Sequence, residues 1–408
     1  MQKYQVAIVG GGAGGMFCAL RLADAGIKDV ILLERNDRLG RKLSVTGNGQ
    51  GNISNEQMSS EHYFSDDLSR VRRVLDFFGK RQLIEYLTAL GGLFVSDETG
   101  RIYPASRQAA SVTDVLRFAL SNRGTVIRLN TYVNSASKKN GRFLIVSGEE
   151  IIAADYLVLC NGGCAASYLG TDGNGYELAR AFGHTISALS PSLVQLKTEQ
   201  APIRGLKGVR SECLLRLFRR DAACADFYGD IIFTDYGISG NAVFRASSFV
   251  RAEDEISIDF LPKFGEKELK ELLAEKAEKY PVFPAEDLLR CVVNSSIGKC
   301  ILRRCGIGLQ SLIRDIVSKI PLIVSMLKGF RLKVLGTMGF DNAQVTKGGV
   351  YMRELDEGLM SLKVENLYFG GELINVDGEC GGYNLQWAFS SGAVVANSIS
   401  ERIKNADR

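Results

Sequence analysis

The sequence is poor in the residues and spacings that build metal sites and disulfide frameworks. Among its 408 residues there are two histidines, His62 and His184, and none of the nine cysteines stands in a C-x-x-C pair. Zinc sites and disulfide scaffolds rely on such pairs or on clustered histidines. We therefore expect no metal, and thiols that are reduced and mostly buried.

Long apolar runs and blocks of one charge are also missing. The apolar run at residues 6–9 is too short for a secretion signal, and no stretch approaches the roughly 20 apolar residues of a membrane span. The formal net charge is only +4, and the basic residues are scattered. The sequence therefore does not predict a basic surface that would bind nucleic acid. We expect a cytoplasmic monomer or homodimer that acts on a small organic molecule, with neither nucleic acid nor membrane as partner.

Glycine, in contrast, is plentiful, with 44 residues gathered mainly in short apolar segments. Single cores stop growing near roughly 250–300 residues, so a chain of this length is expected to hold more than one domain. The glycine-rich character fades near residue 190 and returns after 336. Residues 1–190 and 336–408 are therefore predicted to form one discontinuous domain. Between them we expect a β-rich insert on the substrate side (191–262) and a helical cap (263–335).

The N-terminal segment has the pattern of a dinucleotide-binding turn. A buried strand is predicted at residues 4–9 and a helix at 16–25. Between them Gly10, Gly12 and Gly15 form G-x-G-x-x-G. In such a turn the first glycine makes the bend, the second lets the backbone approach a pyrophosphate, and the third lets helix and strand pack closely. The helix N-terminus supplies N–H groups and partial positive charge for the phosphates.

A second predicted strand, at residues 30–33, completes the βαβ unit, and Glu34 stands at its end. A carboxylate about 20 residues after the glycines accepts hydrogen bonds from ribose hydroxyls in such units. The motif predicts a dinucleotide cofactor, but it does not distinguish FAD from NAD.

Seven further blocks follow in order: R-K and G-N-G-Q-G-N at 41–52, G-R-I-Y-P at 100–104, T-D-G-N-G-Y at 171–176, G-L-K-G at 205–208, F-T-D-Y-G-I-S-G at 233–240, V-T-K-G-G-V at 345–350, and Y-F-G-G-E with C-G-G-Y-N-L-Q at 368–386. Together they resemble the bacterial BaiN/RdsA-like flavoproteins, also described as aminoacetone oxidase-like or HI0933-type proteins. The resemblance spans nearly the whole chain. It implies an α/β fold with a Rossmann-like FAD-binding domain, of the glutathione reductase and fumarate reductase type, interrupted by the insert and the cap.

The resemblance also implies one FAD per chain. The loop 41–52 would wrap the pyrophosphate and flavin, Val133 would lie near the adenine, and residues 382–386 would lie beside the isoalloxazine. A helix that begins near Asn384 would stabilise the anionic reduced flavin through its dipole. The predicted cofactor-binding residues are Gly10, Gly12, Ala13, Gly14, Gly15, Glu34, Arg35, Arg41, Lys42, Thr46, Gly47, Asn48, Gly49, Asn52, Val133, Asn161, Gly162, Gly163, Gly371, Glu372, Asp377, Gly382, Tyr383, Asn384, Leu385 and Gln386.

The chain departs from the family pattern at two places. Gln50 and Gly51 stand where members usually have Arg-Cys, so a mechanism that needs that cysteine is excluded here. Ile374 and Asn375 replace a Leu-Asp pair, which removes a carboxylate.

Three residues are candidates for catalysis. Tyr103 and Tyr383 are predicted proton donors, because a phenol can protonate a carbanion or polarise a carbonyl, and Arg101 is expected to hold an anionic or carbonyl substrate. Cys160 and Cys164 do not have the spacing of a flavin disulfide reductase, so we interpret them as packing thiols.

The favoured hypothesis is an FAD-dependent oxidoreductase that uses NAD(P)H to reduce a C=C bond conjugated to a carbonyl, by hydride transfer from flavin N5. It follows from the family resemblance, which includes members linked to steroid reduction. No second G-x-G-x-x-G follows a predicted strand, so a nicotinamide would dock without its own Rossmann unit. One alternative is an amine or amino-ketone oxidase that uses O2, and another is a non-catalytic, redox-responsive flavoprotein.

Overall fold

A computed structural model describes residues 2–406 and divides the chain into two compact units. The first contains the residues up to Pro191 and those from Gln344 onward, and the second is Ser192–Ala343. Each unit has a hydrophobic core of its own.

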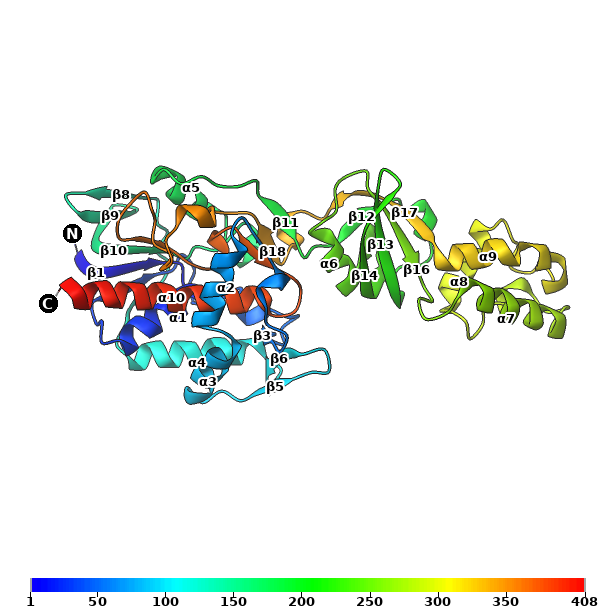
Figure 1. The fold of residues 1–408 in the computed structure, drawn as a ribbon, viewed down its shortest axis with the longest axis horizontal. Helices are drawn as coiled ribbons and strands as arrows, with labels where there is room; N and C mark the ends of the chain where they lie inside the picture. The colour runs from blue at the N-terminus through cyan, green and yellow to red at the C-terminus, as the bar shows by residue number, and fades with distance from the viewer. Residues whose placement is uncertain (1, 407–408) are drawn as a thin grey trace. The chain divides into compact units, whose positions relative to one another are not determined.

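The largest sheet of the first unit is mostly parallel (Figure 1). Its order is β7 (Val126–Arg128), β2 (Val30–Leu33), β1 (Gln2–Val9), β10 (Glu150–Leu159), β9 (Arg142–Ser147) and β8 (Ser135–Lys139), with β19 (Leu367–Phe369) paired to β10. Strands β7, β2, β1, β10 and β19 pair in parallel, whereas β8 and β9 are antiparallel. Ligands of such folds bind outside the carboxyl ends of the parallel strands, so the segments after these strands position the site.

Two helices from opposite ends of the chain, α1 (Ala13–Asp24) and α10 (Tyr383–Ala406), lie side by side in this unit (Figure 1). A Cβ atom added to Gly392 of α10 would lie 2.5 Å from the carbonyl oxygen of Gly14 in α1. The glycines thus allow close approach of the two backbones. The other helices of the unit are α2 (Leu68–Phe77), α3 (Lys80–Ala89), α4 (Ala109–Asn122) and α5 (Asn174–Ala181).

The chain turns sharply between α2 and α3. Helix α2 ends at Phe77, the backbone of Phe78 leaves the helical region, and α3 starts after Gly79. An added Cβ at Gly79 would lie 2.7 Å from the carbonyl oxygen of Leu75, so this tight junction favours glycine.

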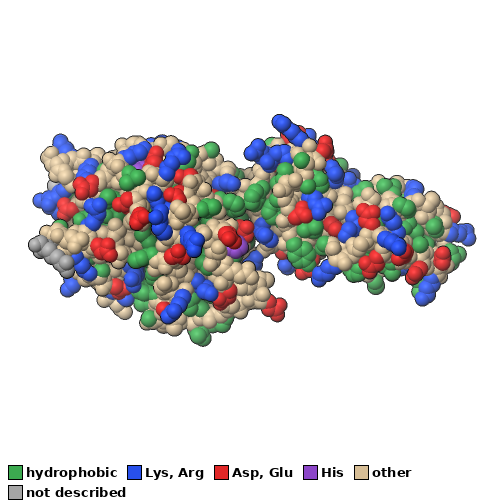
Figure 2. Space-filling view, viewed as in Figure 1, with side chains coloured by type: hydrophobic (Ala, Val, Ile, Leu, Met, Phe, Trp, Pro, Cys, Tyr) green, Lys and Arg blue, Asp and Glu red, His purple; other side chains and the backbone are tan. Residues whose placement is uncertain are grey.

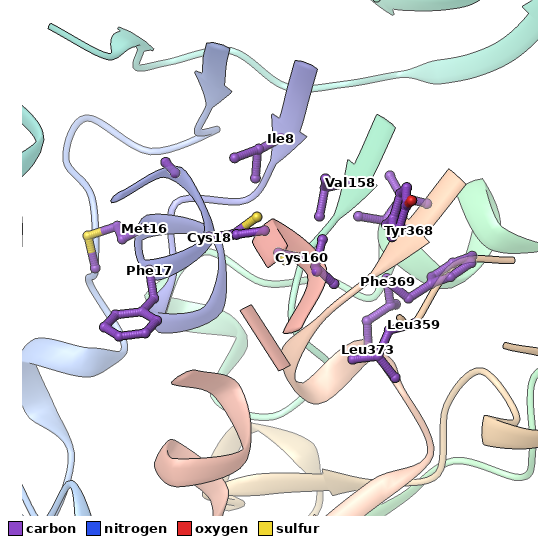
Figure 3. Close-up of a cluster of buried hydrophobic side chains, with 14 of the residues drawn as sticks. Ile8, Met16, Phe17, Cys18, Val158, Cys160, Leu359, Tyr368, Phe369 and Leu373 are labelled. Atoms are coloured by element: carbon purple, nitrogen blue, oxygen red, sulfur yellow. The ribbon is translucent and has the colours of Figure 1, made fainter. Parts of the chain in front are cut away.

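Apolar side chains from the sheet and from α1 meet in one core (Figure 3). Cys18 of α1 and Cys160, directly after β10, lie among them, and both are buried. Burial raises the pKa of the Cys160 thiol to about 12 and also raises that of Cys18. All nine cysteines are free of disulfides, and these two fit the packing interpretation.

Three small sheets complete the first unit and carry much of the site. They are β3 (Ser54–Asn55) with β6 (Arg101–Pro104) and β5 (Phe94–Ser96), β20 (Val376–Gly378) with β4 (Tyr63–Ser65), and β11 (Ser190–Ser192) with β18 (Val345–Lys347). The short 3-10 helices of the chain are η1 (Leu43–Val45), η2 (Ser60–His62), η3 (Ser167–Leu169), η4 (Ala201–Ile203), η5 (Ala285–Asp287), η6 (Ile313–Lys319), η7 (Phe340–Asn342), η8 (Met352–Glu354) and η9 (Gly371–Leu373).

The second unit contains a closed antiparallel barrel. Its strands follow the order β12 (Leu196–Thr198), β15 (Gly237–Ser239), β14 (Ala222–Phe233), β13 (Arg210–Arg219), β16 (Glu255–Asp259) and β17 (Phe330–Thr337). The helices are α6 (Asn241–Ser247), α7 (Glu266–Lys279), α8 (Ser295–Arg304) and α9 (Ile320–Lys328). Barrel and helices share one continuous hydrophobic core.

This unit corrects the predicted end of the helical cap. Residues 330–335 were assigned to the cap, but they belong to β17, which pairs with β16 and β12 and closes the barrel. Alternating burial along Phe330–Val334 fits a strand that has one face in the core.

Acidic and basic side chains alternate over the visible face, without a large region of one sign (Figure 2). Among residues 2–406, no helix has the length and apolar character required to cross a bilayer.

Candidate functional site

Of the three motif glycines in the turn after β1, Gly12 alone has free space where a side chain would lie. Added Cβ atoms would overlap backbone at Gly10 and Gly15: the first would meet the carbonyl group of Cys160, and the second would meet the carbonyl oxygen of Gly10. At Gly12, the residue before α1, an added Cβ would have no atom within 4 Å, and no side chain caps the helix there. Two glycines therefore serve packing, while Gly12 borders open space at a helix N-terminus, which suits a pyrophosphate.

Glu34 is buried at the end of β2 and already serves several protein donors. Its Oε2 atom accepts from the Gly11 backbone N–H at 2.8 Å. Its Oε1 atom accepts from the backbone N–H and side-chain amide of Asn36, at 2.8 and 2.7 Å. A carboxylate has about four acceptor positions, so three protein bonds leave room for one ribose hydroxyl.

Arg35, a predicted cofactor-binding residue, is engaged within the protein. Its guanidinium forms a 2.7 Å ion pair with Asp172 and lies 4.8 Å from the centre of the Tyr132 ring. The neighbouring Val133 is buried, and its carbonyl accepts from the Asn174 side chain at 3.1 Å. These contacts join three segments at the end of the site where the adenine was predicted.

The loop 41–52 is anchored along its length. Lys42 Nζ donates to Glu372 Oε2 at 2.7 Å, and the Thr46 hydroxyl donates to the carbonyl of Leu43 at 2.8 Å. Asn52 donates to the carbonyls of Ser54 and Ile102, at 3.0 and 3.1 Å. Arg41 donates to the side chain of Asn36 at 3.0 Å.

Positive φ angles mark Gly47, Asn48, Gly49 and Gly51 within this loop. An added Cβ at Gly51 would lie 2.8 Å from Cα of Ala109, whereas at Gly49 it would meet nothing within 4 Å. A side chain at Gly51, where the family has cysteine, would therefore require the backbone to move. Gly49 borders open space, as Gly12 does.

Two of the predicted cofactor-binding residues have a buried acceptor atom without a hydrogen-bond partner among the residues that the structure describes. These atoms are Oδ1 of Asn161, directly after β10, and Oδ2 of Asp377 in β20. Burial, with a further contribution from Glu372 and against the opposing effect of Lys347, raises the pKa of Asp377 to about 7. Unpaired buried polar atoms are costly, so both fit a polar ligand such as the sugar or phosphate groups of a dinucleotide.

The two glycines that follow Asn161 stand where a larger residue would not fit. Gly162 has φ +76°, and an added Cβ at Gly163 would overlap Thr346. Thr346 in turn donates its backbone N–H to Glu372 Oε1 at 2.7 Å. Lys42 and Thr346 thus hold the Glu372 carboxylate from both sides, next to Gly371.

At the start of α10, two predicted flavin-contacting side chains are occupied by protein. The Asn384 amide bridges the backbone N–H and carbonyl of Gly378, at 2.8 and 2.7 Å. Gln386 is fully buried and accepts from the Ser54 hydroxyl at 2.6 Å. Asn384 thus holds the loop before the helix, whereas Gln386 connects the helix to β3.

Two of the catalytic candidates lie in β6. The Arg101 guanidinium is partly buried, which disfavours its charge, but neighbouring Cys380 and Tyr103 raise its pKa overall. Tyr103 is buried, and the Arg107 guanidinium lies 4.2 Å from its ring centre. Arg101 is therefore brought beside the segment that leads into α10.

The third candidate, Tyr383, stacks on a residue that sequence reasoning had considered only as a metal ligand. The rings of Tyr383 and His62 are 4.6 Å apart with an interplanar angle of 27°. His62 Nδ1 lies 3.4 Å from Glu379 Oε2. No local motif indicates this group, because it forms through the pairing of β4 with β20, more than 300 residues away.

The comparison with known proteins decides the family. The model of the HI0933-like protein Rossmann domain matches residues 4–398. The chain belongs to the HI0933-like family. This membership confirms the predicted resemblance and the Rossmann-like fold class, and it supports a flavoprotein oxidoreductase as the general class.

Curated relatives of this HI0933-like chain include reductive enzymes. It is 33% identical over 407 residues to a 3-dehydro-bile acid delta(4,6)-reductase of Clostridium scindens, covering 98% of this chain and 99% of the relative. It is 27% identical over 400 residues to the ribosomal RNA dihydrouridine synthase of Escherichia coli, covering 98% of each.

Solved structures support the fold alone. The 3-ketosteroid-delta4-(5alpha)-dehydrogenase of Rhodococcus jostii aligns over 98% of this chain and 97% of its own, with a TM-score of 0.53 and 14% identity. The 3-ketosteroid delta1-dehydrogenase of Sterolibacterium denitrificans aligns over 98% and 100%, with the same TM-score and identity.

Proposed function

We propose that this protein uses FAD and NAD(P)H to reduce a C=C bond conjugated to a carbonyl in a small organic molecule. The observation that carries the proposal is the chemistry shared by relatives that match along the whole chain. A 3-dehydro steroid with delta(4,6) double bonds contains a C=C chain conjugated to a ketone. Dihydrouridine differs from uridine by two hydrogens across a ring C=C that is conjugated to a carbonyl.

The chain offers residues that fit FAD. Gly12 and Gly49 border open space for the pyrophosphate and flavin, and Glu34 retains one acceptor position for a ribose. Asn161 and Asp377 supply buried polar atoms that lack protein partners. When bound and reduced, FAD supplies the hydride.

The side chains of the protein would bind the substrate, stabilise its developing charge and supply the proton. Arg101 would bind the carbonyl oxygen of the substrate and stabilise the negative charge that develops on it, since its guanidinium is held beside the loop that precedes α10. The N-terminus of α10 adds a positive dipole in the same region. A side-chain acid must then protonate the α-carbon, and Tyr103 and Tyr383 were the candidates from sequence.

An anaerobic experiment tests the proposal. The purified yellow protein is mixed with NADH or NADPH while the flavin absorbance is followed. The reduced protein is then mixed with cyclohex-2-enone, a Δ4-3-ketosteroid, uridine or uridine-containing RNA. Bleaching by a nicotinamide, followed by reoxidation with an enone, supports the proposal.

Other results would favour a different substrate or one of the two alternative functions. Reoxidation by RNA alone would replace the small molecule with a nucleic acid substrate. Bleaching only by an amine or amino ketone, with peroxide formed when O2 is admitted, would favour the oxidase alternative. A flavin that no donor reduces would favour the non-catalytic alternative.

A further inference from the structure

His62 and Glu379 are brought together by strand pairing at the edge of the first unit's small sheets. Strand β4 pairs antiparallel with β20, with Tyr63 opposite Gly378. The pairing extends by one residue, because the Glu379 backbone N–H donates to the His62 carbonyl at 2.9 Å. The two side chains therefore leave adjacent strand ends, and His62 Nδ1 lies 3.4 Å from Glu379 Oε2.

The His62 ring is also fixed on its flat face. It stacks on Tyr383, the first residue of α10. Tyr383 is held in turn, because its carbonyl accepts from the Tyr63 hydroxyl at 2.8 Å and its ring packs edge-on against Tyr63 at 5.9 Å. The imidazole is therefore oriented by a carboxylate at its edge and by an aromatic ring on its face.

The His62 side chain is also accessible to solvent. The side chains of His62 and Glu379 are each 29% exposed, whereas Tyr383 is only 4% exposed and Tyr103 only 7%. A small ligand can reach the imidazole edge more readily than either phenol. The chain's other histidine, His184, offers no such edge, because both of its ring nitrogens are engaged, by Glu354 and Ser361.

The surrounding groups suit a reacting carbonyl compound. Cys380 follows Glu379 directly, and Arg101 interacts electrostatically with Cys380. Asn55, which is paired with Arg101 between β3 and β6, donates to the Gly381 carbonyl at 2.9 Å. A cation for the carbonyl oxygen and an oriented imidazole thus border the same four-residue loop, 379–382.

We propose that His62, oriented by Glu379, is the acid that protonates the substrate α-carbon. This inference rests on the proposed function. Hydride addition at the β-carbon moves the C=C electron pair toward the carbonyl oxygen, which Arg101 stabilises. The α-carbon then forms its new C–H bond with the proton from Nε2 of the His62 imidazolium, and the carbonyl re-forms.

The proposal assigns each ring nitrogen a role. Glu379 engages Nδ1 and stabilises the positive charge before transfer. Nε2 is the proton-bearing atom on the opposite edge of the ring, and solvent returns its proton after each turnover. The hydride brings two electrons, which NAD(P)H would supply through bound FAD, and His62 brings the proton. Together they account for the two hydrogens added across the C=C bond.

The test isolates the oxidative half-reaction. Protein reduced anaerobically with dithionite is mixed with cyclohex-2-enone or androst-4-ene-3,17-dione, and flavin reoxidation is followed over a range of pH. His62→Gln keeps a polar partner for Glu379, and His62→Phe keeps the stack on Tyr383. Both should slow reoxidation by about a hundredfold or more, while reduction by NAD(P)H, the FAD dissociation constant and the melting temperature stay near those of the unmodified protein.

The pH profile separates proton transfer from packing. Among the described residues, Glu379 and Tyr383 contact His62, Glu61 and Tyr63 flank it in the chain, and Cys380 follows Glu379. If His62 transfers the proton, the pH dependence of reoxidation in the unmodified protein should be absent from both variants. Glu379→Gln should also slow reoxidation, because the carboxylate next to Nδ1 that orients the ring is lost.

Three results would overturn the role of His62. They are reoxidation within about tenfold of normal in either folded variant, a slowed reaction whose pH profile is unchanged, and slowing that is explained by lost FAD binding. If His62→Gln does not fold, His62→Phe and Glu379→Gln decide the matter. If the unmodified reduced protein is reoxidised by neither enone, the proposed function itself fails.

Discussion

Lys42 and Glu372 form a 2.7 Å ion pair although 330 positions separate them in the chain. The pair connects the loop that was predicted to wrap the pyrophosphate and flavin with Glu372, another predicted cofactor-binding residue. Both side chains are partly exposed, at 30% and 20%. If these residues bind FAD, the pair would hold two parts of the candidate site together.

Replacing Lys42 with methionine should weaken FAD binding by about tenfold, equivalent to about 1.4 kcal/mol. The reason is that the Glu372 carboxylate would keep its bond from Thr346 but lose its charged partner. The dissociation constant is measured by titrating FAD-free protein with FAD. Lys207→Met is the matched control, since it removes a more exposed ion pair with Asp235 in the second unit. Equal FAD affinity in the two variants would refute the role of Lys42.

Gly12→Val should fold normally but purify without flavin. An added Cβ at Gly12 meets no protein atom within 4 Å, so a valine there would occupy the space expected for the pyrophosphate instead of disturbing the core. Gly265→Val is the control, because Gly265 also precedes a helix in an extended conformation and also borders open space. Flavin absorbance and thermal melting are measured on both. Normal flavin content in Gly12→Val would show that the cofactor lies elsewhere.

Asp377 should make the FAD-free protein less stable as the pH rises through about 7. Burial raises its pKa in the folded protein to about 7 from an ordinary value of 3.8. Its contribution to stability is therefore fully present below the ordinary value and is lost as the pH rises through the folded value. Between about pH 6 and pH 8 the loss should be about 1 to 2 kcal/mol.

Asp377→Asn should remove that part of the pH dependence, which denaturant melts at several pH values would measure. Asp67→Asn is the control. The pKa of Asp67 is lowered through its hydrogen bond with Ser69, together with the Arg70 backbone and nearby arginines and against a smaller opposing effect of burial, so its contribution is lost only in acid. Identical slopes for the unmodified protein and Asp377→Asn between about pH 6 and pH 8 would contradict the assignment.

Deleting the second unit should leave a protein that binds FAD but has no substrate-dependent turnover. The connecting segments lie side by side in the first unit, where Ser187 and Gly349 exchange hydrogen bonds of 2.9 Å and β11 pairs with β18. A short linker from Pro191 to Gln344 therefore bridges a small gap. The first unit also has its own core, and the residues that fit FAD all lie within it.

Flavin content, turnover and a thermal melt are measured on the same deletion protein. A folded protein without FAD would mean that the second unit completes the cofactor site. Full turnover with an enone would mean that the substrate pocket belongs to the first unit.

Local sequence was sufficient to predict the glycine turn between β1 and α1. Gly10, Gly12 and Gly15 lie within six residues, so their spacing alone determines which backbone can bend and which can be approached. The apolar runs that became β1 and β2 were equally clear, because strands buried on both faces require continuous apolar residues.

Contacts between distant segments had to come from the tertiary structure. The sequence indicated Glu34 as a ribose ligand, but Asn36 and Gly11 fill most of its acceptor positions. Likewise, residues 330–335 lie in a barrel strand because β12 and β16 supply its hydrogen-bond partners.

His62 gives the clearest contrast. In sequence it is an isolated histidine in a polar segment, while Glu379 and Tyr383 lie more than 300 residues away. Their meeting depends on the register of β4 against β20 and on where α10 begins. Sequence by itself determined the class of fold and the glycine turn after β1, since both depend on spacing between near neighbours. The tertiary structure decided that the His62 imidazole lies next to the Glu379 carboxylate, since strands β4 and β20 pair only in the folded chain.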